Sequence, residues 1–125
     1  MSETNQLHAL LSDMVAAYSS KKAPHIPTPA EIGAHLHPIL DHMCADAEQR
    51  GASDIFISAG FDAHREDDMG QLGLVENDYA WITQRLVQLA DRHAQGRIVS
   101  CLEGGYSLSA LGRSVEAHVR VLADL

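Results

Sequence analysis

The chain has 125 residues, which is enough for one domain at most. Its formal charge is −8, and its longest basic run is Lys21-Lys22, so nucleic acid and anionic membranes are excluded as expected partners. No leader peptide is recognisable, and no apolar run approaches the ~18 residues that a membrane helix needs. We therefore expect a soluble, cytoplasmic protein in which Cys44 and Cys101 are reduced, buried thiols.

The first part of the chain is predicted to be helical. Residues 1–27 contain an amphipathic helix, predicted over 5–18 from the spacing of apolar residues, and a linker with polar and Pro residues. A capping box at 28–31, with Pro at the first helical position, begins a second helix. Pro38 is expected to kink or split that helix, and Gly51 to end it.

The rest of the chain alternates strands and helices. The apolar runs 54–60 and 97–103 have the composition of buried strands in a parallel sheet. A helix predicted over 77–94 connects them, and a last helix begins near Ser107 or Ser109. The order α-β-α-β-α predicts an α/β fold with a right-handed βαβ crossover and parallel strands.

Two polar positions follow the strands at the edge where ligands bind in open α/β sheets. Asp62 follows the first strand, and it could cap a turn or helix or bind a metal. One carboxylate does not make a zinc site, which needs about three protein ligands. Gly104 and Gly105 could form only a tight turn before a packed Tyr106, or they could bring backbone close to a ligand. In the second case the Tyr106 phenol could stabilise an oxyanion.

Other polar and apolar residues are expected to be structural. His35 and His37 face different sides of a helix, and His42 is two turns from His35, so solvated histidines are favoured over a metal site. The acidic run 66–68 is expected to be a solvated loop. Four nearby apolar residues are expected to pack: Met69, Leu72, Leu74 and Trp81.

Three stretches carry a specific resemblance. They are Ile57-Ser-Ala-Gly-Phe-Asp-Ala-His64, Gln71-Leu-Gly-Leu74 and Leu102-Glu-Gly-Gly-Tyr-Ser-Leu108. Together they resemble the C-terminal part of the zinc-dependent deacetylase family, which comprises histone deacetylases, acetylpolyamine amidohydrolases and acetoin-utilisation proteins. Bacterial members and class II histone deacetylases look closest. The resemblance covers 54–125, extends weakly to about residue 28, and is not found in 1–27.

This resemblance implies a partial arginase/deacetylase-like three-layer fold, a parallel sheet between layers of helices. It implies that Asp62 is one of three zinc ligands and that Tyr106 polarises the substrate carbonyl and stabilises the oxyanion. Gly104 and Gly105 would line the acyl-lysine channel. The implied reaction is attack of zinc-activated water on an amide of the acetyl-lysine or acetylpolyamine type.

The chain departs from the family pattern at four places. The family's other two zinc ligands lie in an earlier Asp-x-His stretch, and none precedes Asp62 here. The tandem catalytic His-His pair is missing, Asp68 replaces a usual Pro, and Ser107 replaces a frequent Asp. We therefore expect a truncated deacetylase that is inactive alone and does not bind zinc stably. The alternative is a non-catalytic, oligomeric interaction module that retains the deacetylase scaffold.

The small sheet also predicts self-association. Two apolar strands leave backbone groups without partners on their outer sides. We expect a homo-oligomer, most simply a two-fold dimer, formed by pairing sheets or by laying the 5–18 helix over a neighbour. An acylated amine would be a substrate only if missing segments complete the site.

Overall fold

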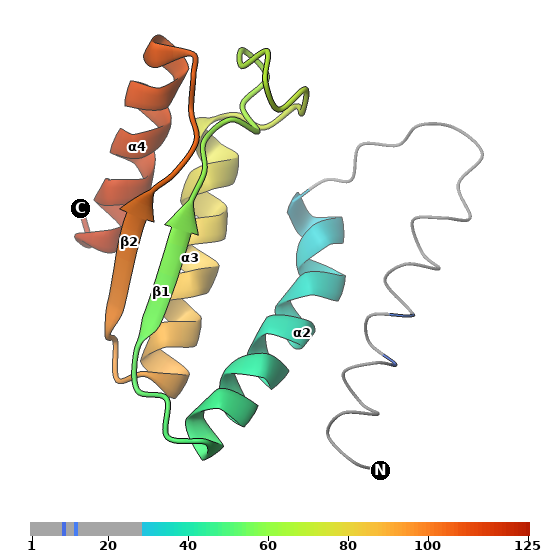
Figure 1. The fold of residues 1–125 in the computed structure, drawn as a ribbon, viewed down its shortest axis with the longest axis vertical. Coiled ribbons are helices and arrows are strands. Elements are labelled where there is room, and N and C mark those ends of the chain that lie inside the picture. Colours follow the sequence, from blue (N-terminus) through green and yellow to red (C-terminus); the bar gives the residue numbers. More distant parts are fainter. Residues whose placement is uncertain (1–8, 10–11, 13–28) are drawn as a thin grey trace. The chain divides into compact units, whose positions relative to one another are not determined.

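The computed structural model describes residues 9, 12 and 29–125, drawn in colour in Figure 1. The predicted helix over 5–18 and the linker that follows lie outside these residues, except for positions 9 and 12, which are helical. The chain divides into two compact units, Met1–Ala52 and Ser53–Leu125. No helix among the described residues is long and apolar enough to cross a membrane.

The first unit contains α2, which spans Pro29–Gln49. Pro38 lies inside this one continuous helix, so of the two expected outcomes the split is wrong and the kink stays a prediction. The helix ends as predicted at Gly51, where φ is +89° and the Gly51 amide donates to the Glu48 carbonyl at 2.9 Å. A left-handed residue just beyond the last turn is the usual way to end a helix, and Gly adopts it at no steric cost.

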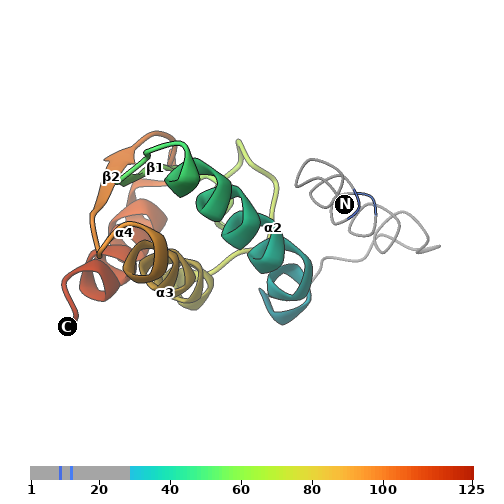
Figure 2. The same ribbon diagram turned by 90° about the horizontal axis from the view of Figure 1, so that it is seen from below.

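The second unit is the predicted βαβα arrangement. Strands β1 (Ile55–Ala59) and β2 (Ile98–Leu102) are parallel, in a register that pairs Ile55 with Ile98 and Ala59 with Leu102. They are connected by α3 (Glu76–His93), and β2 is followed by α4 (Leu108–Leu122). Figures 1 and 2 show that α3 and α4 lie side by side on the same face of the two strands. The parallel pairing and the element order are therefore confirmed.

The core lies between this face of the sheet and the two helices. Phe61 and Tyr79 form its centre with ring centroids 5.1 Å apart, and Ile57, Leu111 and Val115 pack around them. Strand residues alternate between this core and the opposite face, as the pleat requires. The helix α3 begins where the Asp78 carboxylate accepts the Val75 amide at 2.8 Å, a bond that satisfies one donor ahead of the first turn.

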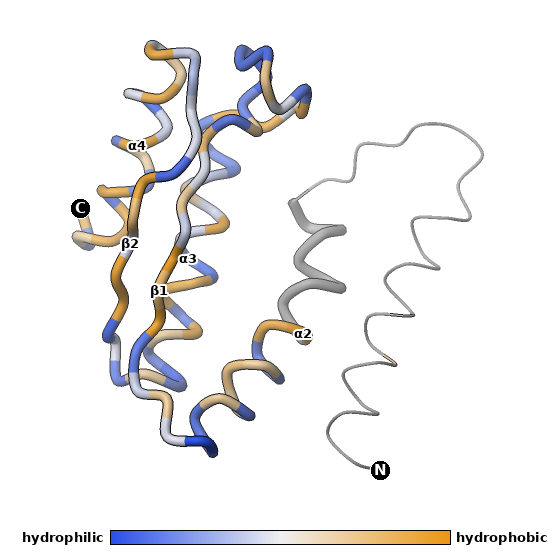
Figure 3. Tube along the Cα trace, in the orientation of Figure 1, coloured by the Kyte–Doolittle hydropathy of each residue, from blue (hydrophilic) through white to orange (hydrophobic). Residues whose placement is uncertain are grey.

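The opposite face of the sheet is exposed, although Figure 3 shows hydrophobic residues along both strands. Phe56 is 74% exposed and its cross-strand neighbour Val99 is 45% exposed. The expectation of strands buried on both faces is therefore wrong for the described residues, because α3 and α4 cover one face only. Cys101 is exposed for the same reason and Cys44 is half-buried, so both thiols are free as expected but neither is buried.

Candidate functional site

Asp62 and Gly104 are brought together at the carboxyl edge of the sheet. Strand pairing continues beyond β1 and β2, because the Glu103 amide donates to the Ala59 carbonyl at 2.9 Å and the Phe61 amide to the Gly104 carbonyl at 2.8 Å. A Cβ on Gly104 would lie 2.9 Å from Asp62 Oδ1, and one on Gly60 3.1 Å from the same oxygen. The Asp62 carboxylate therefore lies against two glycines, in space that side chains at these positions would fill.

Gly105 has a different role from Gly104. Its φ is +142°, and a Cβ at this position would meet Leu111 Cδ1 at 2.6 Å. Both constraints are those of a tight turn packed closely against α4. The local geometry thus explains Gly105 as a turn residue, which was one of the two expected roles. Its place in an acyl-lysine channel stays a prediction.

Tyr106 follows this turn directly and its side chain is 62% exposed. It does not form part of the core, so the packing alternative is wrong for this residue. Its backbone amide is bound by Asp67, as described next. The expectation that its phenol lies at the same edge of the sheet as Asp62 and stabilises an oxyanion stays a prediction.

Asp67 is the residue of this site that sequence patterns missed. It is only 4% exposed, so the predicted solvated loop is wrong at this position. Its Oδ2 accepts the amides of Tyr106 at 2.7 Å and Ser107 at 3.0 Å, and its Oδ1 accepts the amide of Met69 at 3.0 Å. These bonds, the one from Tyr106 first, lower the pKa of Asp67 against the effect of its burial. No local signal predicts this, because the Tyr106 amide is 39 residues away.

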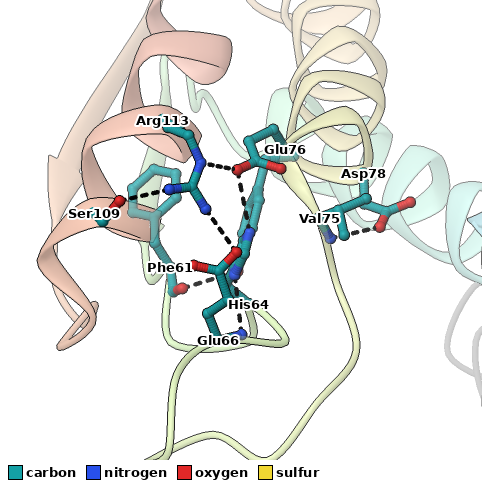
Figure 4. Close-up of polar contacts among 9 residues, drawn as sticks. Phe61, His64, Glu66, Val75, Glu76, Asp78, Ser109 and Arg113 are labelled. Carbon is teal, nitrogen blue, oxygen red and sulfur yellow. Dashed lines mark hydrogen bonds and ion pairs between the residues drawn. The ribbon is translucent and has the colours of Figure 1, made fainter.

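The loop that carries Asp67 is anchored at His64 (Figure 4). This histidine is fully buried, and its Nδ1 accepts the Glu66 amide at 3.1 Å. The neutral ring therefore carries its hydrogen on Nε2, which faces Glu76 Oε1 at 3.4 Å. The two atoms are close enough for an electrostatic contact. Nε2 nevertheless makes no hydrogen bond of good geometry, so its interaction with Glu76 is weak.

Arg113 joins the same loop to both helices. Its Nε donates to Glu76 Oε1 at 2.5 Å, its Nη2 to Glu66 Oε1 at 2.8 Å, and its Nη1 to Ser109 Oγ at 2.6 Å. The hydrogen bond from Arg113 is the main reason that the pKa of Glu76 falls to about 2. One guanidinium thus connects the start of α4 to the loop after β1 and to the start of α3.

Buried polar groups of α3 support the end of β1. The Tyr79 hydroxyl donates to the Phe61 carbonyl at 3.0 Å, directly before Asp62. Burial, with the nearby Asp62 charge as the next cause, raises the pKa of Tyr79 to about 12, so this hydroxyl keeps its proton. One turn further, Thr83 Oγ1 lies 2.7 Å from His118 Nδ1, whose Nε2 lies 2.8 Å from Ser100 Oγ.

The apolar residues of the loop do not share one environment. Leu74 packs against the core as predicted, and Trp81 lies half-buried with the Arg85 guanidinium 5.2 Å from its ring centre. Met69 and Leu72 are exposed, so the expectation that they pack is wrong.

The described residues do not fit a zinc site by themselves. No group of three or more His, Cys, Asp or Glu side chains that could hold a metal occurs among them. Asp62-Ala63-His64 has the Asp-x-His spacing, but His64 is buried against Glu66 and Glu76. A zinc site with Asp62 would therefore need ligands from outside this part of the chain.

Comparisons with known proteins identify the family. Residues 13–122 match the model of the histone deacetylase domain. The chain belongs to the histone deacetylase family. The match includes residues 13–27, for which the sequence motifs showed no resemblance. Members of this family are generally zinc-dependent, and both the resemblance and the deacetylase-like α/β fold are thereby confirmed.

Three similar proteins show how much of a family member is present. Type-2 histone deacetylase 1 of Dictyostelium discoideum is 49% identical over 70 residues, which are 56% of this chain and 5% of that protein. Histone deacetylase 14, chloroplastic, of Arabidopsis thaliana is 30% identical over 114 residues, 90% of this chain and 27% of that protein. The structure of the HDA15 HD domain is 33% identical with a TM-score of 0.59, over 74% of this chain and 24% of that one. The chain thus spans about a quarter or less of each.

Proposed function

We propose that this chain supplies the C-terminal part of a deacetylase active site that hydrolyses amides of the acetyl-lysine or acetylpolyamine type. Asp62 would be one zinc ligand, and the Tyr106 hydroxyl would donate a hydrogen bond to the substrate carbonyl oxygen as negative charge develops there. The observation that carries this proposal is the Asp62 carboxylate lying against Gly60 and Gly104 at the carboxyl edge of the sheet, where ligands bind in open α/β folds.

The chain alone is proposed to be inactive and to hold no zinc stably. A single carboxylate lacks the other ligands that fix a catalytic zinc, and no His-His pair is present in the sequence to move protons. The direct test is equilibrium dialysis of the full chain against zinc, together with an assay on an acetyl-lysine peptide. We expect neither stoichiometric zinc nor turnover. Turnover that Tyr106→Phe abolishes would refute the proposed inactivity.

A hybrid protein tests the roles of the two residues. The aligned segment of the HDA15 HD domain would be replaced by the corresponding residues of this chain, so that the rest of that domain completes the site. We expect the hybrid to deacetylate the peptide, and Asp62→Asn or Tyr106→Phe to remove most of that activity. Asp68→Asn is the matched control, because it makes the same charge change on an exposed residue of the same loop. An active hybrid that tolerates Asp62→Asn would sink the assignment.

The second candidate is a non-catalytic module that self-associates. The exposed pair Phe56 and Val99 favours it, because parallel sheets are usually covered on both faces. The occupant proposed is a second copy of this chain in a two-fold dimer. Sedimentation at micromolar concentration would show a dimer that Phe56→Ser weakens and Leu125→Ser, at the exposed C-terminus, leaves intact. A stable monomer would contradict this candidate.

A further inference from the structure

Asp67 joins the two segments that carry the proposed site residues. It lies in the loop after β1, a few residues beyond Asp62, and its carboxylate reaches across to the segment between β2 and α4. There it accepts the amides of Tyr106 at 2.7 Å and Ser107 at 3.0 Å. Hydrogen bonds to a buried carboxylate are among the stronger ones in proteins, because the acceptor is charged. One side chain thus fixes the backbone of Tyr106 relative to the loop of Asp62.

The carboxylate of Asp67 also supplies a negative charge at the N-terminus of α4. Ser107 is the N-cap of α4 but its side chain makes no capping bond, and the first turn contains no acidic residue. Helix N-termini leave amides without partners and carry partial positive charge, which a carboxylate stabilises. Asp67 provides the negative charge at this helix end from a different part of the chain.

Asp67 is itself held in place from the other side. Its Oδ1 accepts the Met69 amide, and the turn before it is tied down by the bond from the Glu66 amide to His64 Nδ1 and by the ion pair of Glu66 with Arg113. By contrast, the Tyr106 ring is largely exposed, so packing does little to fix it. The position of its hydroxyl therefore depends on its backbone, and the backbone depends on Asp67.

We propose that Asp67 is a positioning residue for Tyr106, which holds the phenol at the edge of the sheet where Asp62 lies. The consequence for catalysis rests on the proposed function, in which Tyr106 donates to the substrate carbonyl. The positioning itself can be measured in the chain alone, without zinc or substrate. It predicts that the Tyr106 side chain has one preferred rotamer because its backbone is anchored, although the ring is exposed.

The first measurement is made on the full 125-residue chain labelled with ¹⁵N and ¹³C. Scalar couplings through the hydrogen bonds should connect the Tyr106 and Ser107 nitrogens to the Asp67 carboxyl carbon. Asp67→Ala should speed amide exchange at these two positions roughly tenfold to a hundredfold relative to the buried Leu89, and should average the χ1 couplings of Tyr106. Asp67→Asn keeps one acceptor oxygen that can face both amides, so it should retain most of the protection and the rotamer.

Asp68→Ala is the control, because it removes the same carboxylate from the neighbouring, exposed position of the loop. If Asp67→Ala does not fold, the couplings in the unmodified chain and the exchange rates of Asp67→Asn decide the question. Missing couplings, or a Tyr106 rotamer that Asp67→Ala leaves unchanged, would overturn the proposal. A hybrid enzyme that is inactive or indifferent to Tyr106→Phe would instead refute the proposed function, and these measurements would still decide whether Asp67 positions Tyr106.

Discussion

Replacing Thr83 by Val should destabilise the second unit by removing one hydroxyl from a buried chain of hydrogen bonds. Thr83 is 2% exposed, and its Oγ1 donates to the Tyr79 carbonyl at 2.6 Å. Since that bond uses the only hydroxyl hydrogen, Oγ1 must accept from His118, which fixes the hydrogen of the neutral imidazole on Nδ1. His118 Nε2 then accepts from the Ser100 hydroxyl at 2.8 Å.

The size of the effect follows from what the mutation leaves behind. Val has nearly the shape of Thr, so no cavity forms, and the Tyr79 carbonyl keeps its helical amide partner. His118, however, is buried and loses the partner of one ring nitrogen, whichever tautomer it adopts. A buried polar group without its partner costs about 1–3 kcal/mol. Because whole domains are stable by only about 5–15 kcal/mol, a loss of this size is easily measured.

Urea unfolding at pH 7.5 is a suitable assay, because the single tryptophan, Trp81, lies in α3 and reports on this unit. Gln84→Ala, at the exposed neighbouring position, is the control and should change stability by less than about 0.5 kcal/mol. The double variant with His118→Leu should cost less than the sum of the single changes, since it removes both partners. A Thr83→Val protein within about 0.5 kcal/mol of the unmodified chain, or strictly additive costs, would refute the assigned network.

Two further outcomes can be measured in the same unfolding assay. Because the Arg113 guanidinium lowers the pKa of Glu76 from 4.5 to about 2, the stability that Glu76 contributes should be complete above pH 4.5 and lost as the pH falls toward 2. Arg113→Met should remove this contribution, and a stability difference between the two proteins that does not change with pH would contradict the assignment. Gly104→Ala should cost about 1–3 kcal/mol by pushing on the Asp62 carboxylate, and should inactivate the hybrid enzyme. Gly112→Ala, with open space around its Cβ position in α4, should instead stabilise by up to about 1 kcal/mol, and equal effects at both glycines would argue against the crowding at Gly104.

His118, the buried histidine of the Thr83 network, should make the stability of the unit depend on pH near neutrality. Burial lowers the pKa of His118 below its usual value of 6.5, so the folded chain keeps the ring neutral where the unfolded chain begins to bind a proton. The stability of the unit should therefore be complete above pH 6.5 and fall as the pH decreases toward the lower pKa of the folded state. His118→Leu should abolish this part of the dependence of stability on pH. If the His118→Leu protein keeps the same slope in this range, the pH dependence belongs to another group.

The sheet and its edge could be predicted from sequence because they depend on local signals. Two apolar runs and one amphipathic helix between them dictate a βαβ unit, and such a unit places the residues after both strands at one edge. Asp62 and Gly104 meet there as the topology requires. The coverage of the sheet could not be predicted in the same way. Apolar runs indicate strands that can be buried on both faces, but whether Phe56 is covered depends on elements distant in sequence or outside the described residues.

The polar part of the site was missed because its partners are distant in sequence. The run 66–68 has the composition of a solvated loop, and for Asp68 that prediction holds. Asp67 differs from Asp68 because the fold brings two amide donors to its carboxylate from the segment beyond β2. Arg113 likewise meets Glu66 across 47 residues, a separation at which no pattern of charges along the chain is informative.

The environments of the acidic residues after β1 indicate which of them is available for chemistry. Asp67 is buried and its two oxygens already accept three amides, so it is committed to structure. Glu66 and Glu76 are bound by Arg113, which stabilises their charge. Asp62 is only half-buried, and its carboxylate lies against Gly60 and Gly104, where a Cβ at either position would crowd it. Carboxylates in such different surroundings take different roles, and the role proposed for Asp62 would leave the structural bonds of Asp67 and Arg113 unbroken.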